Sequence, residues 1–272
     1  MTWLKENTPE DAIIASWWDY GYWITTLSDR TTLADNATLI DWQIQKMAYA
    51  LITTPDKSWH ILSSHYTEDI SEYLGDENVV AYKKGFNAIT YSEWLSQSPE
   101  NKDCKPISIT EAKKLNIEKQ ECFPVGQGLD ADYIVIYIAG ERFYTQDSTI
   151  PLYTLEGGGD ESKKTWYAAI SNHQVSKYIQ DDNITPTDYY MEKSTLGLLT
   201  PFSIVTYVEP NTGRTFDDYF SGFIPVYVAE LKLKDPENDP FYLVYASPSF
   251  YSQESGPMST VLIYKINHDY NS

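Results

Sequence analysis

A short apolar run that leads directly into a dense aromatic string is the feature that most constrains this chain. Residues Ala12–Ala15 are apolar throughout, which predicts a buried strand of about four or five residues. The string Ser16–Trp23 then brings five aromatic residues, the carboxylate of Asp19 and Gly21. A strand that only fills a core carries Val, Ile and Leu, so we expect this string to form a pocket where the strand ends.

The residue types in the string favour the binding of a small polar group. Trp17 and Trp18 each offer an indole N–H, and an ionised Asp19 only accepts hydrogen bonds. A buried carboxylate costs several kcal/mol unless it is hydrogen-bonded, so Asp19 needs donors close by. A rigid aromatic pocket with donors and one acceptor suits a hydroxyl. The alternative is a strand end that forms an aromatic corner of the core with a turn at Gly21, and such clusters are more commonly part of the core.

Length and charge limit the classes of protein that this chain can represent. At 272 residues it can form one large domain or two units, and its net charge of −19 makes nucleic acid an unfavourable partner. The sequence contains no run of about 18 apolar residues, so we expect no transmembrane helix in it. Met1–Glu6 does not resemble the start of a signal peptide. Cys104 and Cys122 favour a disulfide, with two buried free thiols as the alternative.

Apolar periodicity predicts further helices and strands before residue 140. A helical stripe (Ile40, Ile44, Met47, Ala48 and Leu51) follows a helix entry at Asp35 and stops at Thr53–Asp56. We also expect a strand at Trp59–Leu62, a helix at Glu68–Leu74, a largely polar insertion at about 83–130 with a helix at Thr110–Glu118, and a central strand at Tyr133–Ile138.

A second pattern combines charge with helical spacing. After Gly157–Gly159, the residues Asp160, Lys163, Tyr167 and Ile170 recur at i, i+3, i+7 and i+10, which is one face of a helix. Asp160 stands where an N-cap is expected. On spacing alone, Asp160 merely caps the helix and Lys163 is a solvated charge. We expect this helix to continue toward Gln180.

The chain changes character at Pro201. One more helix is expected at Thr187–Leu199, and turn-rich spacers then separate four β-type runs: Phe202–Val208, Ile224–Ala229, Phe241–Ala246 and Val261–Ile266. The fold class is therefore α+β, or mixed α/β. We expect an α-rich central core around the strand of the aromatic string at residues 1–200, including the insertion, and an antiparallel β-rich unit at 201–272 packed on that core.

The string Trp17–Gly21, WWDYG, resembles the signature of the oligosaccharyltransferase catalytic subunit, in its soluble C-terminal domain. The flanking residues Asn7–Ala12 and Arg30–Thr38 also resemble the family pattern. Archaeal and eukaryotic members carry DxxKxxxMxxI, which Asp160, Lys163 and Ile170 match, while Tyr167 stands in place of Met. This variant and the short β-rich tail resemble the archaeal type.

The resemblance implies how an acceptor Asn-X-Ser/Thr sequence would be bound. Trp17, Trp18 and Asp19 would hold the Ser or Thr hydroxyl, Ile170 would touch the Thr methyl, and Lys163 would order the pocket. Tyr20, Gly21, Asp160 and Tyr167 complete the motifs. The intact enzyme would be a membrane glycosyltransferase that uses a dolichol-linked oligosaccharide and Mn²⁺ or Mg²⁺, with this domain on the extracytoplasmic side. Its catalytic and metal-binding residues would lie outside this chain, which alone is expected to be inactive.

Other functions and sites are compatible with parts of the sequence. A carbohydrate- or peptide-binding module could use Trp17, Trp18 and Tyr20 as a stacking platform. A glycosidase could pair Asp19 with Glu156, although nothing in the sequence pairs them. The irregular spacing of His60, His65, Glu68 and Asp69 makes a metal site unfavourable. Asn36 and Asn183 each begin an Asn-X-Thr sequence and could carry a glycan.

Overall fold

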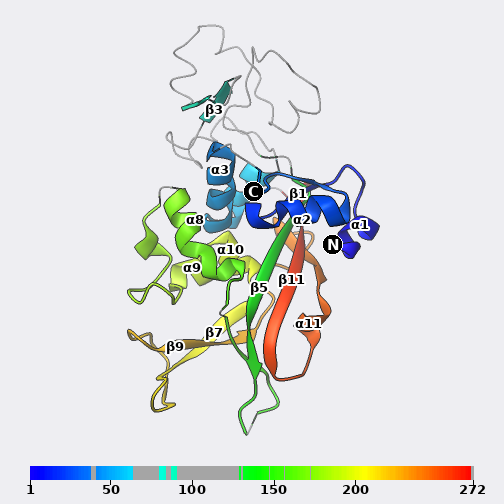
Figure 1. The fold of residues 1–272 in the computed structure, drawn as a ribbon. Coiled ribbons are helices and arrows are strands. Elements are labelled where there is room, and N and C mark those ends of the chain that lie inside the picture. Colours follow the sequence, from blue (N-terminus) through cyan, green and yellow to red (C-terminus); the bar gives the residue numbers. More distant parts are fainter. Residues whose placement is uncertain are drawn as a thin grey trace.

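The computed structural model combines one large mixed sheet with helices on both of its faces (Figure 1). It describes residues 1–37, 41–63, 80–83, 87–90, 129, 131–146, 148–155, 157–171 and 173–270, with the backbone alone at 41–43, 80–83 and 87–90. The α+β fold class predicted from the sequence is confirmed. No helix in the described residues has the length and apolar character needed to cross a membrane.

The helices are mostly short. They are α1 (Thr2–Asn7), α2 (Trp18–Ser28), α3 (Asp41–Ile52), α4 (Pro55–Leu62), the 3₁₀ helix η3 (Asp160–Lys163), α8 (Lys164–Ile170), the 3₁₀ helix η4 (Val175–Lys177), α9 (Asp188–Lys193), α10 (Thr195–Leu199) and α11 (Pro248–Tyr251).

The large sheet draws strands from both ends and the middle of the chain. Its strands are β1 (Ile13–Ala15), β2 (Thr31–Thr32), β5 (Tyr133–Phe143), β6 (Leu152–Thr154), β7 (Phe202–Val208), β8 (Thr215–Phe216), β9 (Ile224–Ala229), β10 (Phe241–Ala246) and β11 (Gly256–Ile266). The main path runs β10-β11-β5-β6-β9-β7-β8, and β1 adds a parallel pairing to β5 and to β2. A separate hairpin joins β3 (Val80–Lys83) and β4 (Asn87–Thr90).

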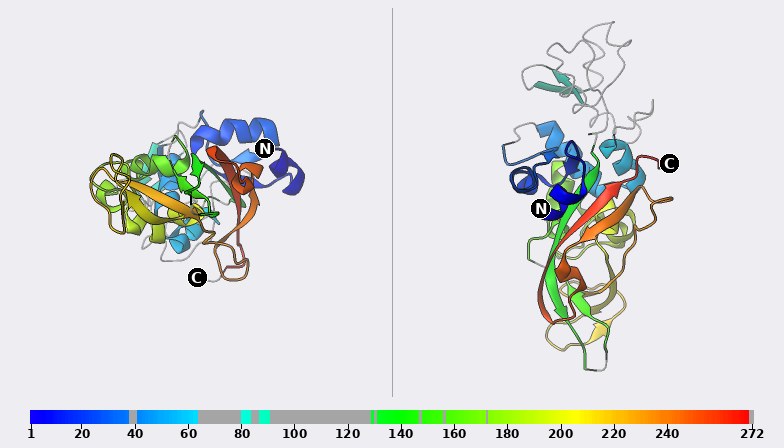
Figure 2. Two further views of the ribbon diagram at one scale, coloured as in Figure 1. Left: turned by 90° about the horizontal axis from the view of Figure 1, so that it is seen from below. Right: turned by 90° about the vertical axis from the view of Figure 1, so that its right-hand side faces the viewer.

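The long strand β5 is central, as its apolar run predicts. It pairs antiparallel with β11 from Tyr133 opposite Lys265 to Arg142 opposite Gly256, and the two strands lie side by side in every view (Figure 2). β1 pairs with its first residues, Ile14 lying opposite Tyr133. Because β5 is buried over most of its first half, it can be apolar on both faces without exposing hydrophobic surface.

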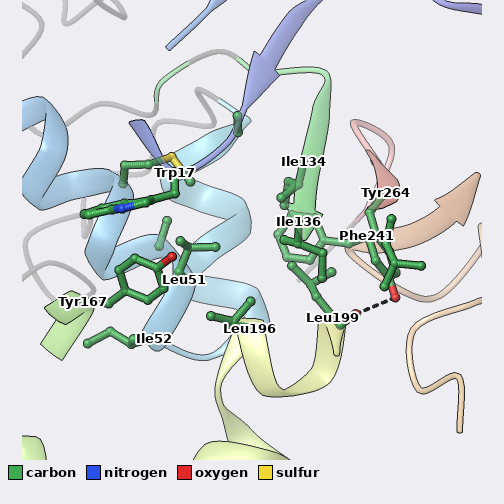
Figure 3. Packing of buried hydrophobic residues seen from close by; sticks show 14 of the residues in the cluster. Trp17, Leu51, Ile52, Ile134, Ile136, Tyr167, Leu196, Leu199, Phe241 and Tyr264 are labelled. Atoms are coloured by element: carbon green, nitrogen blue, oxygen red, sulfur yellow. Dashed lines mark hydrogen bonds between the residues drawn. The ribbon is translucent and has the colours of Figure 1, made fainter. Parts of the chain in front are cut away.

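Side chains of β5 alternate between two hydrophobic clusters, as the period of a strand requires. Ile134, Ile136 and Ile138 enter the main core with residues of α3, α4, α8 and α10. Tyr133 and Val135 point to the other face, into a smaller cluster under α1 and α2. Figure 3 shows Ile134 and Ile136 between Leu51 and Tyr167 on one side and Phe241 and Tyr264 on the other.

Two segments differ from the structure that their sequence predicts. Trp59–Leu62 is the end of helix α4, not a strand: Pro55 occupies the first turn, and the buried Trp59 indole donates to the carbonyl of Asn267 at 2.7 Å. The expected helix Thr187–Leu199 is two helices, because Ser194 ends α9 and caps α10. Its hydroxyl accepts from Gly197 N at 3.0 Å and donates to Tyr190 O at 2.6 Å.

The strands after Pro201 have the predicted bounds for β7, β9 and β10, and β11 begins five residues before the predicted run, at Gly256 instead of Val261. They do not form a sheet of their own. β11 pairs with β5 and β9 pairs with β6, so residues 201–272 extend the sheet of the preceding part of the chain. The division into 1–200 and 201–272 stays a prediction about folding units. Glu68–Leu74, Thr110–Glu118, most of the insertion and both cysteines lie outside the described residues.

Candidate functional site

The aromatic string forms the start of helix α2 directly after strand β1, so the turn at Gly21 that an aromatic core corner implies is wrong. Trp17 is the N-cap of α2, and Asp19 and Gly21 lie within its first turns. Gly21 is buried against the segment that follows β2: a Cβ there would lie 2.0 Å from the carbonyl oxygen of Ala34. The glycine therefore permits close packing inside a helix, and Asp19 faces the next element of the site from the first turn.

The second motif is pressed against β5. Gly159 precedes η3, and a Cβ on it would lie 2.7 Å from the backbone nitrogen of Ala139. This approach puts Asp160 at the side of β5, where its Oδ2 accepts from the backbone N–H of Tyr137 at 2.8 Å. Gly159, not Asp160, is the N-cap, so the predicted capping role of Asp160 is wrong. The helical face is split between η3 and α8, and α8 ends at Ile170 instead of continuing toward Gln180.

Asp160 is a buried hub for hydroxyl groups from two elements. Its Oδ1 accepts from Tyr20 of α2 at 3.1 Å and from Tyr167 of α8 at 2.9 Å. With the Tyr137 N–H, the carboxylate has three donors and is only 1% exposed. A buried carboxylate persists when its oxygens are satisfied in this way.

Lys163 joins the two motifs. Its Nζ donates to Asp19 Oδ2 at 2.7 Å and to the Tyr20 hydroxyl at 2.8 Å, and lies 3.8 Å from Asp160 Oδ1. The ammonium also lies 4.5 Å from the centre of the Tyr20 ring. Tyr20 therefore accepts from Lys163 while it donates to Asp160, which places the two carboxylates on either side of one cation.

Burial sets the protonation of this cluster. It raises the pKa of Asp160, and the hydrogen bonds from Tyr137, Tyr167 and Tyr20 and the charge of Lys163 oppose that change. Burial and the neighbouring Asp160 raise the pKa of Tyr20 far above its usual range. The same two causes raise the pKa of Tyr167. Both phenols therefore stay protonated and remain donors to Asp160.

Aromatic rings form the apolar side of the site. Trp17 is buried, and its ring meets the edge of Tyr167 with centroids 4.6 Å apart. Trp18 contacts Trp17 at 6.3 Å and, like Ile170, is partly buried at the margin of the main core. The departure of Tyr167 from Met thus supplies both a ring contact to Trp17 and a hydroxyl to Asp160, which spacing alone does not reveal.

Exposure separates the parts of the site. The side chains of Asp19 and Lys163 are 36% and 18% exposed, whereas Asp160 is buried. Within the part of the chain that the structure describes, nothing donates to the second oxygen of Asp19, Oδ1. The outer end of the cluster thus presents the partly exposed carboxylate of Asp19, which Lys163 holds in place and which follows Trp17 and Trp18 in the sequence.

Other candidate residues do not join this cluster. His60 is buried on α4 beside Trp59, while His65, Glu68, Asp69 and Glu156 lie outside the described residues. Among the residues described, no group of three or more His, Cys, Asp or Glu side chains could hold a metal ion. Asn183 is exposed in a loop, and Asn36 is exposed before undescribed residues.

Comparison with known proteins places part of the chain in a family. Residues 9–113 match the STT3/PglB/AglB core domain. Subunit STT3 of the dolichyl-diphosphooligosaccharide–protein glycosyltransferase from Saccharomyces cerevisiae is 44% identical over 73 residues, 27% of this chain and 10% of that protein. The stt-3 subunit from Caenorhabditis elegans is 32% identical over 104 residues, 38% of this chain and 14% of that protein.

The chain is also similar to a solved structure, the C-terminal domain of PglB from C. jejuni. The alignment covers 97% of this chain and 96% of that domain, at 13% identity and a TM-score of 0.33. A score this low supports no argument from that structure. The matched segments span only about a tenth of the curated relatives' length. The segment 9–113 contains WWDYG, and over this segment the chain is similar to the STT3/PglB/AglB core domain.

Proposed function

We propose that this chain is the acceptor-recognition part of an oligosaccharyltransferase, and that it binds the Ser or Thr two residues after the acceptor Asn. The family match and the names of the relatives support the enzyme class. The observation that carries the site is the 2.7 Å contact between Lys163 Nζ and Asp19 Oδ2, because it joins two motifs 144 residues apart.

In this proposal Asp19 Oδ1 accepts a hydrogen bond from the Ser or Thr hydroxyl. Lys163 holds the other carboxylate oxygen, and the Trp17 and Trp18 indoles supply donors and an apolar wall. A residue without a hydroxyl leaves these polar groups unpaired, so it is rejected. Contact of Ile170 with the Thr methyl adds about 0.8 kcal/mol, the value of one buried CH₂-sized group, and favours Thr over Ser.

The reaction itself is proposed to need more than this chain. The whole enzyme would transfer an oligosaccharide from a dolichol carrier to Asn, in a membrane, with this domain on the extracytoplasmic side. The described residues offer no set of ligands that fits Mn²⁺ or Mg²⁺. We propose that the metal ligands of the intact enzyme lie outside this chain. We expect this chain alone to bind acceptor peptide without glycosylating it.

Burial of the indole favours this proposal over a sugar-binding platform. Trp17 is only 5% exposed and its ring is covered by Tyr167. A sugar stacks on an open aromatic face, which Trp17 does not offer. The partly exposed carboxylate of Asp19 instead suits a hydroxyl at the end of a short side chain.

Titration followed by NMR tests the proposal. Peptides with Asn-X-Thr, Asn-X-Ser and Asn-X-Ala, and a free oligosaccharide, are added while the indole N–H signals of Trp17 and Trp18 are recorded. We expect shifts with Thr, weaker binding with Ser and none with Ala. Asp19→Ala should abolish the shifts, and Asp11→Ala, an exposed residue on the loop before β1, is the matched control. Shifts that persist in Asp19→Ala, or that need only sugar, would contradict the proposal.

A further inference from the structure

An apolar pocket lies on the other side of η3 from the Asp160 cluster. It has a volume of about 250 Å³ and is formed by the end of β6, η3, the 182–186 loop and the start of β9. Its apolar lining consists of Leu155, Ile184, Pro186, Phe223, Ile224, Pro225 and Tyr227. Tyr227 is 1% exposed, so the floor of the pocket is part of the main core.

The size of the pocket indicates what it can hold. Sites for cofactors and drug-sized ligands usually measure about 300–1,000 Å³, which is more than this pocket offers. One large apolar side chain fits a volume of 250 Å³. Single side chains buried in such pockets are the anchors that provide most of the affinity of a bound peptide.

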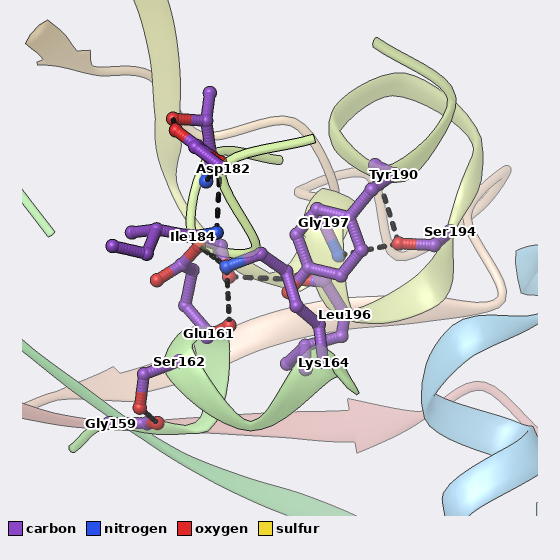
Figure 4. A network of polar contacts seen from close by, with 12 residues as sticks. Gly159, Glu161, Ser162, Lys164, Asp182, Ile184, Tyr190, Ser194, Leu196 and Gly197 are labelled. Atoms are coloured by element: carbon purple, nitrogen blue, oxygen red, sulfur yellow. Dashed lines mark hydrogen bonds and ion pairs between the residues drawn. The ribbon is translucent and has the colours of Figure 1, made fainter. Parts of the chain in front are cut away.

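The wall formed by the 182–186 loop is fixed before any ligand binds. The Asp182 carboxylate accepts from the backbone N–H of Ile184 at 2.9 Å and of Thr185 at 2.8 Å. It also accepts from the Thr185 hydroxyl at 2.6 Å. Ile184 nevertheless remains 69% exposed, and Figure 4 shows it beside Asp182 and above Glu161. A rigid loop that exposes an apolar side chain loses little conformational entropy when it binds a partner.

Charge around the pocket is negative. Its lining includes Glu161 and Asp182 and contains no basic side chain in the described part of the chain. Glu161 is neutralised by Lys164 at 2.6 Å, which leaves Asp182 as the free charge of the lining. Asp181, the neighbour of Asp182, accepts from the Tyr219 hydroxyl at 2.7 Å, and two further acids, Asp217 and Asp218, precede Tyr219 in the loop before β9.

An exposed aromatic surface adjoins the pocket. Phe223 lines the pocket and packs against Phe216 and Phe220, with ring centroids 4.8 and 5.5 Å away. Phe220 is 55% exposed although it is large and apolar. Apolar surface that is bordered by charge is typical of an interaction site.

We propose that this pocket binds a peptide segment that inserts one large apolar side chain and carries Lys or Arg beside it. The apolar walls provide the anchor site, and the acids at the rim provide charge complementarity. This binding site is separate from the proposed hydroxyl site and does not depend on it.

The test uses a synthetic peptide with a central Phe between Lys and Arg residues and without an Asn-X-Ser/Thr sequence. Methyl NMR signals of Ile184 and Ile224 report binding. We expect saturable shifts at both methyls, and a dissociation constant at least about tenfold weaker when the Phe is replaced by Ala. A peptide with Glu in place of the basic residues should not bind.

Variants of the chain separate the pocket from general attraction to an acidic protein. Ile184→Ser should weaken binding several-fold, while Ile150→Ser, at a similarly exposed isoleucine outside the pocket, should not. The double variant Asp181→Asn with Asp218→Asn should bind the peptide more weakly, and its binding should depend less on salt. The control double variant, Asp11→Asn with Glu254→Gln, removes the same number of charges and should show smaller changes. Asp19→Ala should leave this binding unchanged.

Three results would overturn the proposal. They are the absence of methyl shifts at about 2 mM peptide, well above the concentrations at which specific anchors bind, equal affinity for the Phe and Ala peptides, and equal loss in the two charge-reduced variants. Equal loss would show that the peptide is attracted by net charge alone.

Discussion

Two lysines in one turn of η3 and α8 form ion pairs with acids three residues earlier, yet the two pairs are built differently. Lys163 lies 3.8 Å from Asp160 and makes its shorter contact, 2.7 Å, with Asp19 of another helix. Lys164 lies 2.6 Å from Glu161, and both side chains of that pair are buried. The pair of Lys163 and Asp160 thus also contacts a distant segment, and Lys163 is partly exposed to solvent. The pair of Lys164 and Glu161, here called the closed pair, is buried within its own turn.

The comparison shows that neighbouring residues of the same type can serve different purposes. Lys164 neutralises a carboxylate within its own turn, donates to Glu161 O at 3.1 Å and lies 5.7 Å from the Tyr190 ring. It therefore stabilises the local fold. Lys163 orients Asp19 because the other donors on Asp160 leave its ammonium available.

The largest effect is expected when the closed pair is broken. Lys164→Met leaves Glu161 buried without its cation, which should lower the free energy of unfolding by about 3–5 kcal/mol. Chemical denaturation measures this loss. The double variant Lys164→Met with Glu161→Leu, which removes both charges, should recover most of it. A single variant as stable as wild type would show that Glu161 is solvated.

Removal of one donor from Asp160 should have a smaller effect. Tyr167→Phe keeps the ring contact with Trp17 but removes the hydroxyl, and should cost about 1–3 kcal/mol because a buried carboxylate loses a partner. Tyr167→Met, which restores the residue of the family pattern, should cost more since the ring is lost as well. Trp fluorescence would report movement of Trp17. Equal stability of wild type and Tyr167→Phe would contradict the hub role of Asp160.

Lys163→Met should change stability least among the three lysine and tyrosine variants, on the order of 1 kcal/mol, because Asp19 remains in contact with water. Its effect on binding should be much greater: Asn-X-Thr peptide should no longer shift the indole signals. Lys163→Arg is the informative control, since it keeps the charge but not the geometry of the ammonium. Normal peptide binding by Lys163→Met would refute the positioning role of Lys163.

The smallest expected effect is on how the free energy of unfolding changes with pH, through the carboxyl group of Asp160. Burial raises the pKa of Asp160 in the folded protein above its value in the unfolded chain, so the folded state holds this proton more tightly. This group therefore contributes stability below its unfolded pKa that is lost as pH rises through its folded pKa. From about pH 4 upward, Asp160→Asn should make the change of stability with pH more positive than in wild type. An unchanged slope would mean that the hydrogen bonds outweigh burial.

Apolar patterns allowed much of the sheet to be predicted, because a strand buried on both faces must be continuously apolar. Tyr133–Ile138 and the runs that became β7, β9 and β10 illustrate this. The helical stripe of α3 was equally clear. The secondary structure of Trp59–Leu62 was not clear from its own sequence, because four apolar or aromatic residues fit a strand or a helix. The residues that begin the helix decide between the two.

The residues of the candidate site could be proposed from the sequence, but the contacts between them could not. Gly21 indicates a turn when only the local sequence is known, whereas its role depends on the carbonyl of Ala34, which packs against it. The hydroxyl bonds of Tyr20 and Tyr167 depend on where β5 places Asp160. Contacts between distant segments leave no local pattern in the sequence.

The pairing of β5 also has a consequence for how the protein acquires its shape. Ile14 near the start of the chain pairs with Tyr133, and Ile263 near the end pairs with Val135. Contacts between residues so far apart slow folding, because long loops must close before the contacts form. Synthesis must reach β11 before β5 has both neighbours, so we expect α2, which follows β1, to dock and to complete the site only after β11 has been made.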